Sequence, residues 1–175
     1  QHRRLERLDA SEAVRTKLDV REFSPKQVPK DVVDDVMEAA RLSPSGVNSQ
    51  HWRFILVRGR DRLSTLAEDS STGGWVEQAD FAVVICTDPK RSFHAFDAGR
   101  AAQNMQVAAW GHGVTSGLYT GFKQSEMKKD FDIPEDMNVT AVVAFGYPAH
   151  RQLGKKSRLP MGKVAFDDRF GKPLA

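Results

Sequence analysis

The sequence of 175 residues contains a single cysteine, Cys86. One thiol excludes an internal disulfide framework and a multi-cysteine metal site. Cys86 lies within the apolar run 81–86, where we expect it to be a small buried hydrophobe. A chain of this length can bury a core without covalent staples, so we expect one domain over residues 1–175.

The chain also lacks an apolar run of membrane-spanning length, and its start, Gln1-His2-Arg3-Arg4, leads into no signal-like segment. We therefore expect a cytoplasmic protein that does not enter a membrane. No charge of one sign is in large excess, because 26 Lys and Arg stand against 23 Asp and Glu. The resulting net charge of +3 weakly favours anionic ligands and does not indicate a nucleic-acid partner.

No familiar nucleotide or metal motif is complete in this sequence. The glycines of 111–113 and Gly117 have the wrong spacing for a dinucleotide fingerprint, and they follow a helical pattern. There is no Walker loop and no metal-binding His-Glu pair. For His51, His94 and His112 we expect positions at the surface or at the edge of the core. The sequence therefore predicts neither a metal site nor an obligatory side-chain nucleophile.

The apolar periodicity predicts four short strands and a larger share of residues in helices. Pro29 opens a segment with a one-sided apolar stripe, and Pro44 ends it. A long helix over 93–112 carries small residues on more than one face and should be buried on most sides. Strands are expected at 54–57, 81–87, 114–119 and 139–145. Shorter helices are expected at 11–18, with Ser11 as the N-cap, and at 61–68 and 126–131. From Gly146 on we expect an irregular basic tail. This order has no strict βαβ alternation, which predicts an α+β fold.

The most informative stretch is 42–54, between a predicted helix and a predicted strand. Pro44 and Gly46 break the helix and leave backbone amides free of any ladder. Asn48 and Gln50 add side-chain amides that both donate and accept hydrogen bonds. Such a loop suits a planar heterocycle whose edge alternates acceptors and donors. The alternative is an ordinary helix-to-strand loop.

Positive charge gathers in two distant segments. Lys17 and Arg21 lie early in the chain, and Lys156 and Arg158 lie late. If the fold brings the segments together, they form an anion site, in which Arg158 could bind a phosphate with two hydrogen bonds and Lys156 could add a point charge. Two separate solvated turns are the alternative.

Taken in order, these segments resemble the nitroreductase-like flavoproteins over nearly the whole chain. The matching segments are Lys17-x-Asp19-Val20-Arg21-x-Phe23, residues 39–54, Ala101-Ala102-Gln103-Asn104, residues 117–121 and residues 156–160. Each segment is a weak signal alone, whereas five in the right order are a strong one. The resemblance implies a central, mostly antiparallel sheet flanked by helices, in a homodimer that holds one FMN per subunit at its interface.

The resemblance also implies a role for individual residues toward FMN. Lys17 would reach the phosphate, Asp19 the ribityl chain, and Arg21 the pyrimidine edge, where a fixed cation stabilises the reduced flavin. The ring and the cofactor tail would be lined by Ser45, Gly46, Asn48 and Gln50, N5 would face the backbone amides of Thr120 and Gly121, and the phosphate would be clamped by Lys156 and Arg158.

This sequence departs from the family pattern at several points. Lys17 stands where Arg is expected, Asp19 replaces the commoner Ser, and His51 replaces the usual Pro before Trp52. A carboxylate near a phosphate is repulsive unless a neighbouring cation neutralises it. Without the proline, the rigidity of the loop is in question. Only residues 88–94 fill the place of the helical lid found in larger members, so we expect an open substrate face.

The implied reaction is reduction of bound FMN by NAD(P)H, followed by electron transfer to a nitroaromatic, quinone or similar small acceptor in a ping-pong sequence. Two alternatives stay open. The start of the chain also resembles enzymes that fragment reduced flavin with oxygen to make dimethylbenzimidazole, in which the residue at Asp19 takes part in the chemistry. Loop 46–50 fits the reductases better. The second alternative is a flavin-binding protein with negligible turnover.

Overall fold

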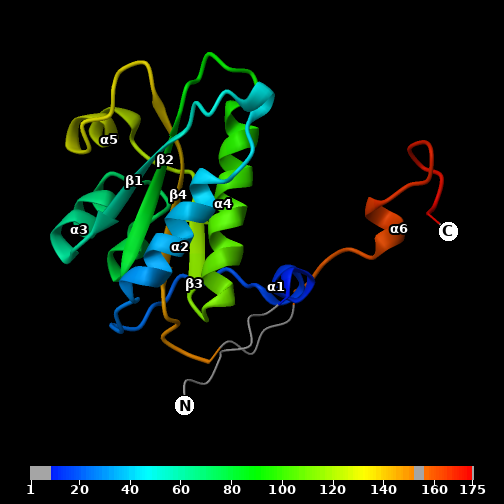
Figure 1. Cartoon of the computed structure of the whole chain (residues 1–175), viewed down its shortest axis with the longest axis horizontal. Coiled ribbons are helices and arrows are strands. Elements are labelled where there is room, and N and C mark those ends of the chain that lie inside the picture. Colours follow the sequence, from blue (N-terminus) through cyan, green and yellow to red (C-terminus); the bar gives the residue numbers. More distant parts are fainter. Residues whose placement is uncertain (1–8, 152–155, 175) are drawn as a thin grey trace.

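The computed structural model describes residues 9–151 and 156–174. Its four strands form one antiparallel sheet in the order β1-β2-β4-β3 (Figure 1). The strands are β1 (Arg53–Arg58), β2 (Phe81–Thr87), β3 (Thr115–Tyr119) and β4 (Asn138–Gly146). The prediction of an α+β fold with a central antiparallel sheet is therefore confirmed, and each expected strand is present.

The helices also lie where the periodicity predicts them, with two corrections. They are α1 (Ala10–Thr16), α2 (Lys30–Arg41), α3 (Arg60–Glu68), α4 (His94–Gly111), α5 (Gln124–Asp130) and α6 (Met161–Val164), with short 3₁₀ turns η1 (Gly46–Asn48) and η2 (Gly74–Gln78). The predicted cap Ser11 is wrong, because the Asp9 carboxylate accepts the Glu12 N–H at 2.9 Å. The tail is not wholly irregular, since it contains α6.

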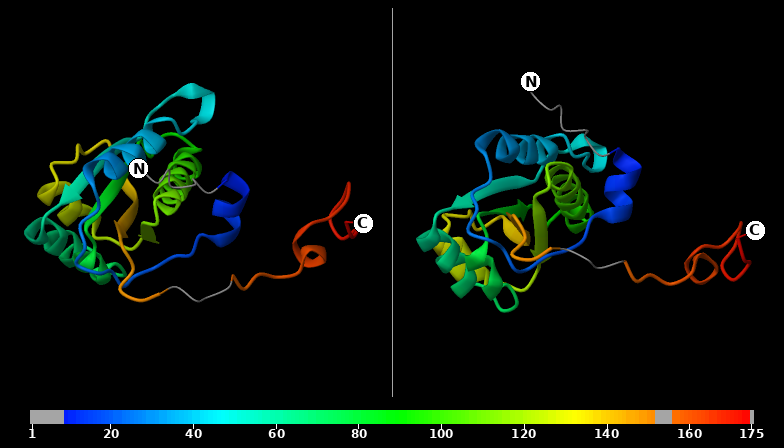
Figure 2. Two further views of the ribbon diagram at one scale, coloured as in Figure 1. Left: turned by 60° about the horizontal axis from the view of Figure 1, so that its bottom comes forward. Right: turned by 90° about the horizontal axis from the view of Figure 1, so that it is seen from below.

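Strand β2 lies between two apolar cores, and all its residues are buried. Successive side chains of a strand point to opposite faces of the sheet. Phe81 and Ile85 pack with α2 and α4, whereas Ala82 and Cys86 pack with α3, η2 and α5. Figure 2 shows these two helical layers on either side of the sheet. The predicted burial of Cys86 is confirmed, and it raises the pKa of the thiol to about 11.

Helix α4 is the long helix that the sequence predicts, but the expectation that it is buried on most sides is wrong. Only one face is buried, because the sheet and α2 cover that side alone, and Gly99, Gln103 and Asn104 are exposed. It packs against the sheet through alanines and Met105, which is fully buried. At its C-terminal end, Trp110 Nε1 donates to Thr16 Oγ1 of α1 at 2.9 Å, and His112 Nε2 lies 2.9 Å from Asp35 Oδ2 of α2. Among the described residues, no helix is both long and apolar enough to cross a membrane.

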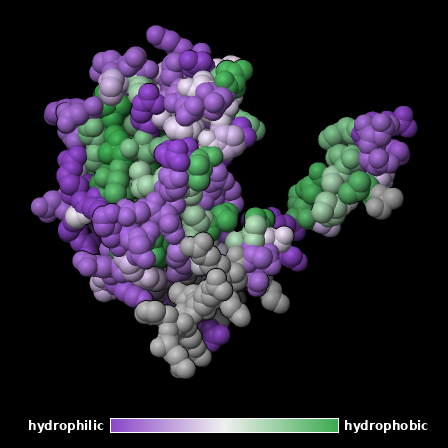
Figure 3. Space-filling model, in the orientation of Figure 1, coloured by the Kyte–Doolittle hydropathy of each residue, from purple (hydrophilic) through white to green (hydrophobic). Residues whose placement is uncertain are grey.

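The tail, residues 156–174, extends away from the rest of the chain (Figures 1 and 2). A hydrogen bond from Lys156 Nζ to the Val14 carbonyl ties its start to α1. Figure 3 shows hydrophobic surface along this segment. The large apolar side chains exposed on it are Leu159, Met161, Val164, Phe170 and Leu174, of which Phe170 is 93% exposed. Apolar groups gathered in this way mark a surface that packs against another one.

Candidate functional site

A cavity of about 500 Å³ lies between the segment after α1, helix α4, strand β3 and the start of the tail. We call it the basic cavity. Its lining residues are Lys17, Leu18, Asp19, Gln103, Gln106, Leu118, Lys156, Ser157 and Arg158. The structure therefore brings together Lys17 with Lys156 and Arg158, three cations from opposite ends of the chain.

The Asp19 carboxylate lies at the centre of a hydrogen-bond network in this cavity. Its Oδ1 atom accepts from Lys17 Nζ at 2.7 Å and from Gln106 Nε2 at 3.0 Å. Gln106 Nε2 also lies 3.1 Å from Ser116 Oγ on β3. Lys17 is 8% exposed, so its ammonium is held within the structure and neutralises Asp19. The carboxylate that would repel a phosphate is thus compensated by Lys17.

The segment that carries Asp19 lies alongside β3. Asp19 forms a parallel bridge with Ser116, and the Val20 N–H donates to the Ser116 carbonyl at 2.8 Å. Gly117 permits this close approach, because a Cβ there would lie 2.7 Å from the Trp75 ring and closer still to the Val20 carbonyl. Because position 117 is glycine, the segment that carries Asp19 can lie against β3, and this places Asp19 at the wall of the basic cavity.

Loop 45–50 does not line the basic cavity. It lies at the N-terminal end of α4, whereas the tail begins near the other end of that helix (Figure 1). Asn48 and Gln50 are exposed, and Ser45 and Gly46 are half-buried. Within one chain, the two groups of predicted FMN residues are therefore separated along α4.

The position predicted for His51 at the surface or core edge is wrong. His51 is 8% exposed, and its Nε2 atom lies 3.1 Å from Oδ2 of the fully buried Asp97. The buried carboxylate of Asp97 needs donors, and this imidazole supplies one of them. His94 and His112 do lie at the edge of the core, as predicted, and bond to Thr87 and Asp35. No group of three or more metal-ligating side chains occurs in residues 9–151 and 156–174.

Three further predicted residues lie outside the basic cavity. Arg21 is exposed, and its guanidinium carbon lies 5.6 Å from the centre of the Trp75 ring. Thr120 is exposed just beyond β3. Gly121 is half-buried, and its carbonyl accepts the Ser71 N–H at 2.9 Å. The roles of these residues stay predictions.

Sequence reasoning missed Gln106, which joins Asp19 to β3. It is 4% exposed in the middle of α4. The spacing offers a partial signal, because Gln106 lies on the same helical face as Ala98, Ala102 and Ala109, and a buried amide must find hydrogen-bond partners. What the sequence could not supply was the identity of those partners, which come from two other elements.

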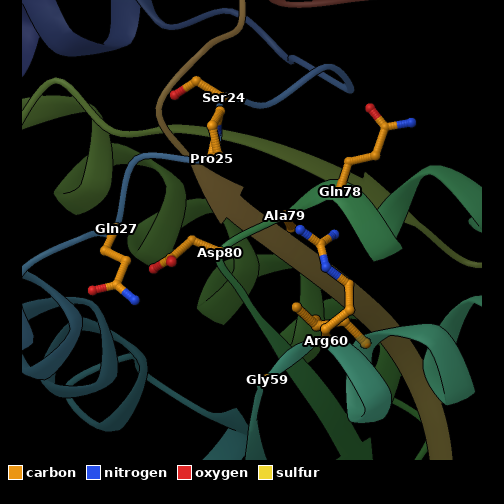
Figure 4. Close-up of a pocket in the computed structure, with 9 residues that line it drawn as sticks. Ser24, Pro25, Gln27, Gly59, Arg60, Gln78, Ala79 and Asp80 are labelled. Carbon is orange, nitrogen blue, oxygen red and sulfur yellow. The ribbon is translucent and has the colours of Figure 1, made fainter.

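A second, smaller cavity of about 240 Å³ lies beside α3 (Figure 4). Its walls are formed by Ser24, Pro25, Gln27, Gly59, Arg60, Leu63, Gln78, Ala79 and Asp80. Asp80 Oδ2 accepts the Val28 N–H at 3.1 Å, and Arg60 Nη1 donates to the Glu77 carbonyl at 2.5 Å. Both charged side chains are thus engaged with backbone groups of the chain. This cavity is a weaker candidate than the basic cavity.

Comparison with known proteins identifies the family of this chain. Residues 14–88 and 67–147 match the Nitroreductase family. A protein of Methanothermobacter thermautotrophicus, provisionally named an NADH dehydrogenase/NAD(P)H nitroreductase, is 31% identical over 154 residues, which cover 83% of this chain and 81% of that protein. The chain therefore belongs to the nitroreductase family, as the sequence predicts.

Solved structures share the fold. An FMN-dependent nitroreductase from Clostridium difficile R20291 superposes with a TM-score of 0.83 at 21% identity, over 90% of this chain and 98% of that one. A protein of Bacteroides thetaiotaomicron VPI-5482, provisionally named an NADH dehydrogenase/NAD(P)H nitroreductase, gives a TM-score of 0.82 at 26% identity, over 90% and 96%. The predicted nitroreductase-like fold is confirmed.

We expect Gln106→Leu to lower the free energy of unfolding by about 1–3 kcal/mol, because Asp19 and Ser116 lose a buried partner. Urea unfolding of the FMN-free protein measures this. Gln103→Leu is the matched control, since Gln103 is exposed on the same helix. Its effect should stay within about 0.5 kcal/mol. Equal losses in the two variants would contradict a special role for Gln106.

Proposed function

We propose that this protein is an FMN-dependent oxidoreductase that takes electrons from NAD(P)H and passes them to a nitroaromatic, quinone or similar small acceptor. Membership of the nitroreductase family supports the class of enzyme, and the FMN-dependent nitroreductase of the same fold supports the cofactor. The observation that carries the proposal is the basic cavity, in which cations from both ends of the chain meet. The cytoplasm is the expected location.

The residues of the basic cavity fit FMN. Its volume of about 500 Å³ lies within the usual range for ligand pockets, roughly 300–1,000 Å³. Lys156 and Arg158 suit a phosphate, while Asp19 and Gln106 suit the hydroxyls of a ribityl chain. Leu118 adds apolar surface. When bound, FMN supplies the ring that accepts hydride from NAD(P)H and returns the electrons to the acceptor.

The hydrogen bonds in the basic cavity suggest different roles toward the FMN phosphate for its three cations. Lys156 and Arg158 would hold the phosphate, because their hydrogen bonds go to backbone carbonyls and no carboxylate of residues 9–151 and 156–174 pairs with them. Lys17 acts on the phosphate less directly, since its ammonium is held by Asp19. Arg21 would face the pyrimidine edge, and the backbone amides of Thr120 and Gly121 would face N5, as the family resemblance implies.

The separation of loop 45–50 from the basic cavity supports a homodimer. Ser45, Gly46, Asn48 and Gln50 lie too far along α4 to join the cavity of their own chain (Figure 1). In a dimer, the loop of one subunit completes the site of the other. The exposed apolar side chains of the tail supply a surface for such a partner.

FMN should co-purify at about one molecule per chain, and Arg158→Ala should weaken its binding by about 1.5–3 kcal/mol, the usual value for a charge-assisted hydrogen bond. Fluorescence titration measures the affinity. Lys163→Ala is the control, because Lys163 is an exposed cation farther along the tail. A colourless protein that fails to bind added FMN would refute the proposed function.

A chain that ends after Arg158 should lose its dimeric state or its flavin, because the apolar side chains beyond that point would no longer cover a partner. Light scattering reports the mass, and absorbance reports the flavin. Phe170→Ser, which changes one exposed side chain, should have a smaller effect than the truncation. A sharp dimeric and yellow truncated protein would rule out this role for the tail.

The kinetics should be ping-pong. Residues 88–93, between β2 and α4, are too few to form a helical lid there, so NAD(P)H and the acceptor would use the same open face one after the other. Double-reciprocal lines should be parallel when NAD(P)H is varied at several acceptor concentrations. Intersecting lines would show that both substrates bind together.

The same assays separate the proposed reductase from its two alternatives. Asp19→Ser should retain reductase turnover, because Lys17 and Gln106 hold Asp19 in a positioning role. A flavin-fragmenting enzyme would instead form dimethylbenzimidazole in air and lose that activity in Asp19→Ser. A flavin-binding protein would show negligible NAD(P)H oxidation with any acceptor.

A further inference from the structure

Loop 45–50 has a strained backbone. Val47, Asn48 and Gln50 adopt positive φ angles of 47°, 55° and 47°. This region is unfavourable for residues with a Cβ, and most unfavourable for a β-branched residue such as Val47. Conformations of this kind persist only where surrounding contacts hold them, and they cluster at functional sites. The conformation of this loop therefore depends on the contacts around it.

Asp97, in the first turn of α4, supplies the main contacts. It is fully buried, and its Oδ2 atom accepts the Gly46 N–H at 2.9 Å and lies 3.1 Å from His51 Nε2. The Gln50 N–H donates to Ser45 Oγ at 2.8 Å, which closes the loop on itself. One carboxylate oxygen thus holds the loop at its start and just after its end.

The imidazole of His51 is committed to this bond. A carboxylate oxygen accepts, so Nε2 of His51 must carry the proton. The other ring nitrogen, Nδ1, is buried and has no hydrogen-bond partner among the described residues. Burying Nδ1 without a hydrogen-bond partner costs free energy. The contact between Nε2 and Asp97 is therefore the polar interaction that favours an imidazole at this position.

Two further contacts restrict the pair. The His51 ring packs edge-on against Phe93, with 5.8 Å between ring centroids, and a Cβ at Gly46 would lie 2.7 Å from the same Phe93 ring. The guanidinium of Arg100 lies 3.7 Å from Asp97 Oδ1. Oδ1 has no hydrogen-bond partner among the described residues, so the carboxylate is held mainly through Oδ2, by the loop and His51, with the charge of Arg100 near its other oxygen.

We propose that His51 and Asp97 are positioning residues that hold loop 45–50 in its strained conformation before flavin binds, an inference that rests on the proposed function. No proline stiffens residues 45–51, so the rigidity of the loop depends on contacts such as those of this pair. A preformed loop raises the affinity for FMN, because the loop loses little conformational entropy when the cofactor binds. The side chains of Asn48 and Gln50 are then presented in one arrangement.

The affinity of full-length protein for FMN, measured by fluorescence titration, tests the pair. His51→Leu should weaken binding at least about 10-fold, as expected for loss of a hydrogen bond to a charged group. His51→Gln should restore it to within about 3-fold, because its side-chain amide can donate to Asp97. His112→Leu is the matched control: it removes a His–Asp contact of 2.9 Å at the other end of α4 and should change the affinity less than about 2-fold.

Amide hydrogen exchange of the FMN-free protein distinguishes failure of this inference from failure of the proposed function. In His51→Leu, residues 46–51 should exchange faster while the buried part of α4 stays protected. If the unaltered protein binds no FMN, the proposed function fails, and the exchange result still decides whether the pair holds the loop. A folded His51→Leu protein with unchanged loop protection and unchanged FMN affinity would overturn the inference. A loss of global stability without a change in affinity would overturn it as well.

Discussion

The close packing of α4 against the sheet is the constraint on which the rest of the structure depends. Its buried face consists largely of alanine, so the helix backbone approaches the strands closely. From this fixed position, the helix presents Asp97 to loop 45–50 and Gln106 to Asp19. Asn104 Nδ2 also donates to Ser43 Oγ at 2.9 Å. Helix α4 thus sets the positions of both loop 45–50 and the basic cavity, and a shift of this helix would move the two together.

The three cations of the basic cavity differ in how they are paired. Lys17 is held by Asp19, so this pair contributes little net charge. Lys156 and Arg158 bond to the carbonyls of Val14 and Ser157, and within the described part of the chain no carboxylate pairs with them, so their positive charge suits an anion. Because both lie at the start of the tail, the affinity of the cavity for a phosphate and the placement of the tail involve the same segment. This links cofactor binding to the proposed dimer.

Most of the fold could be predicted from the sequence because its signals are local. Strand β2 is a continuous apolar run, and it is buried on both faces. The stripe of α2 and the small residues of α4 likewise reflect the faces that each helix buries. The cap of α1 was predicted wrongly, because Asp9 and Ser11 are both good N-cap residues and only the backbone geometry chooses between them. The family was also predicted, since its motifs follow one another in a fixed order along the chain.

The sequence by itself determined the antiparallel α+β fold, the burial of Cys86 and the residue types suited to an anion and a planar ring. Only the tertiary structure decided which of these residues meet. It joins Lys17 and Asp19 to Lys156 and Arg158 in one cavity and separates them from loop 45–50. It also gives His51 a buried partner in Asp97, which no spacing in the sequence indicates. The physical reason is that periodicity reports how each element buries its own apolar face, whereas polar contacts between distant segments depend on how the elements pack together.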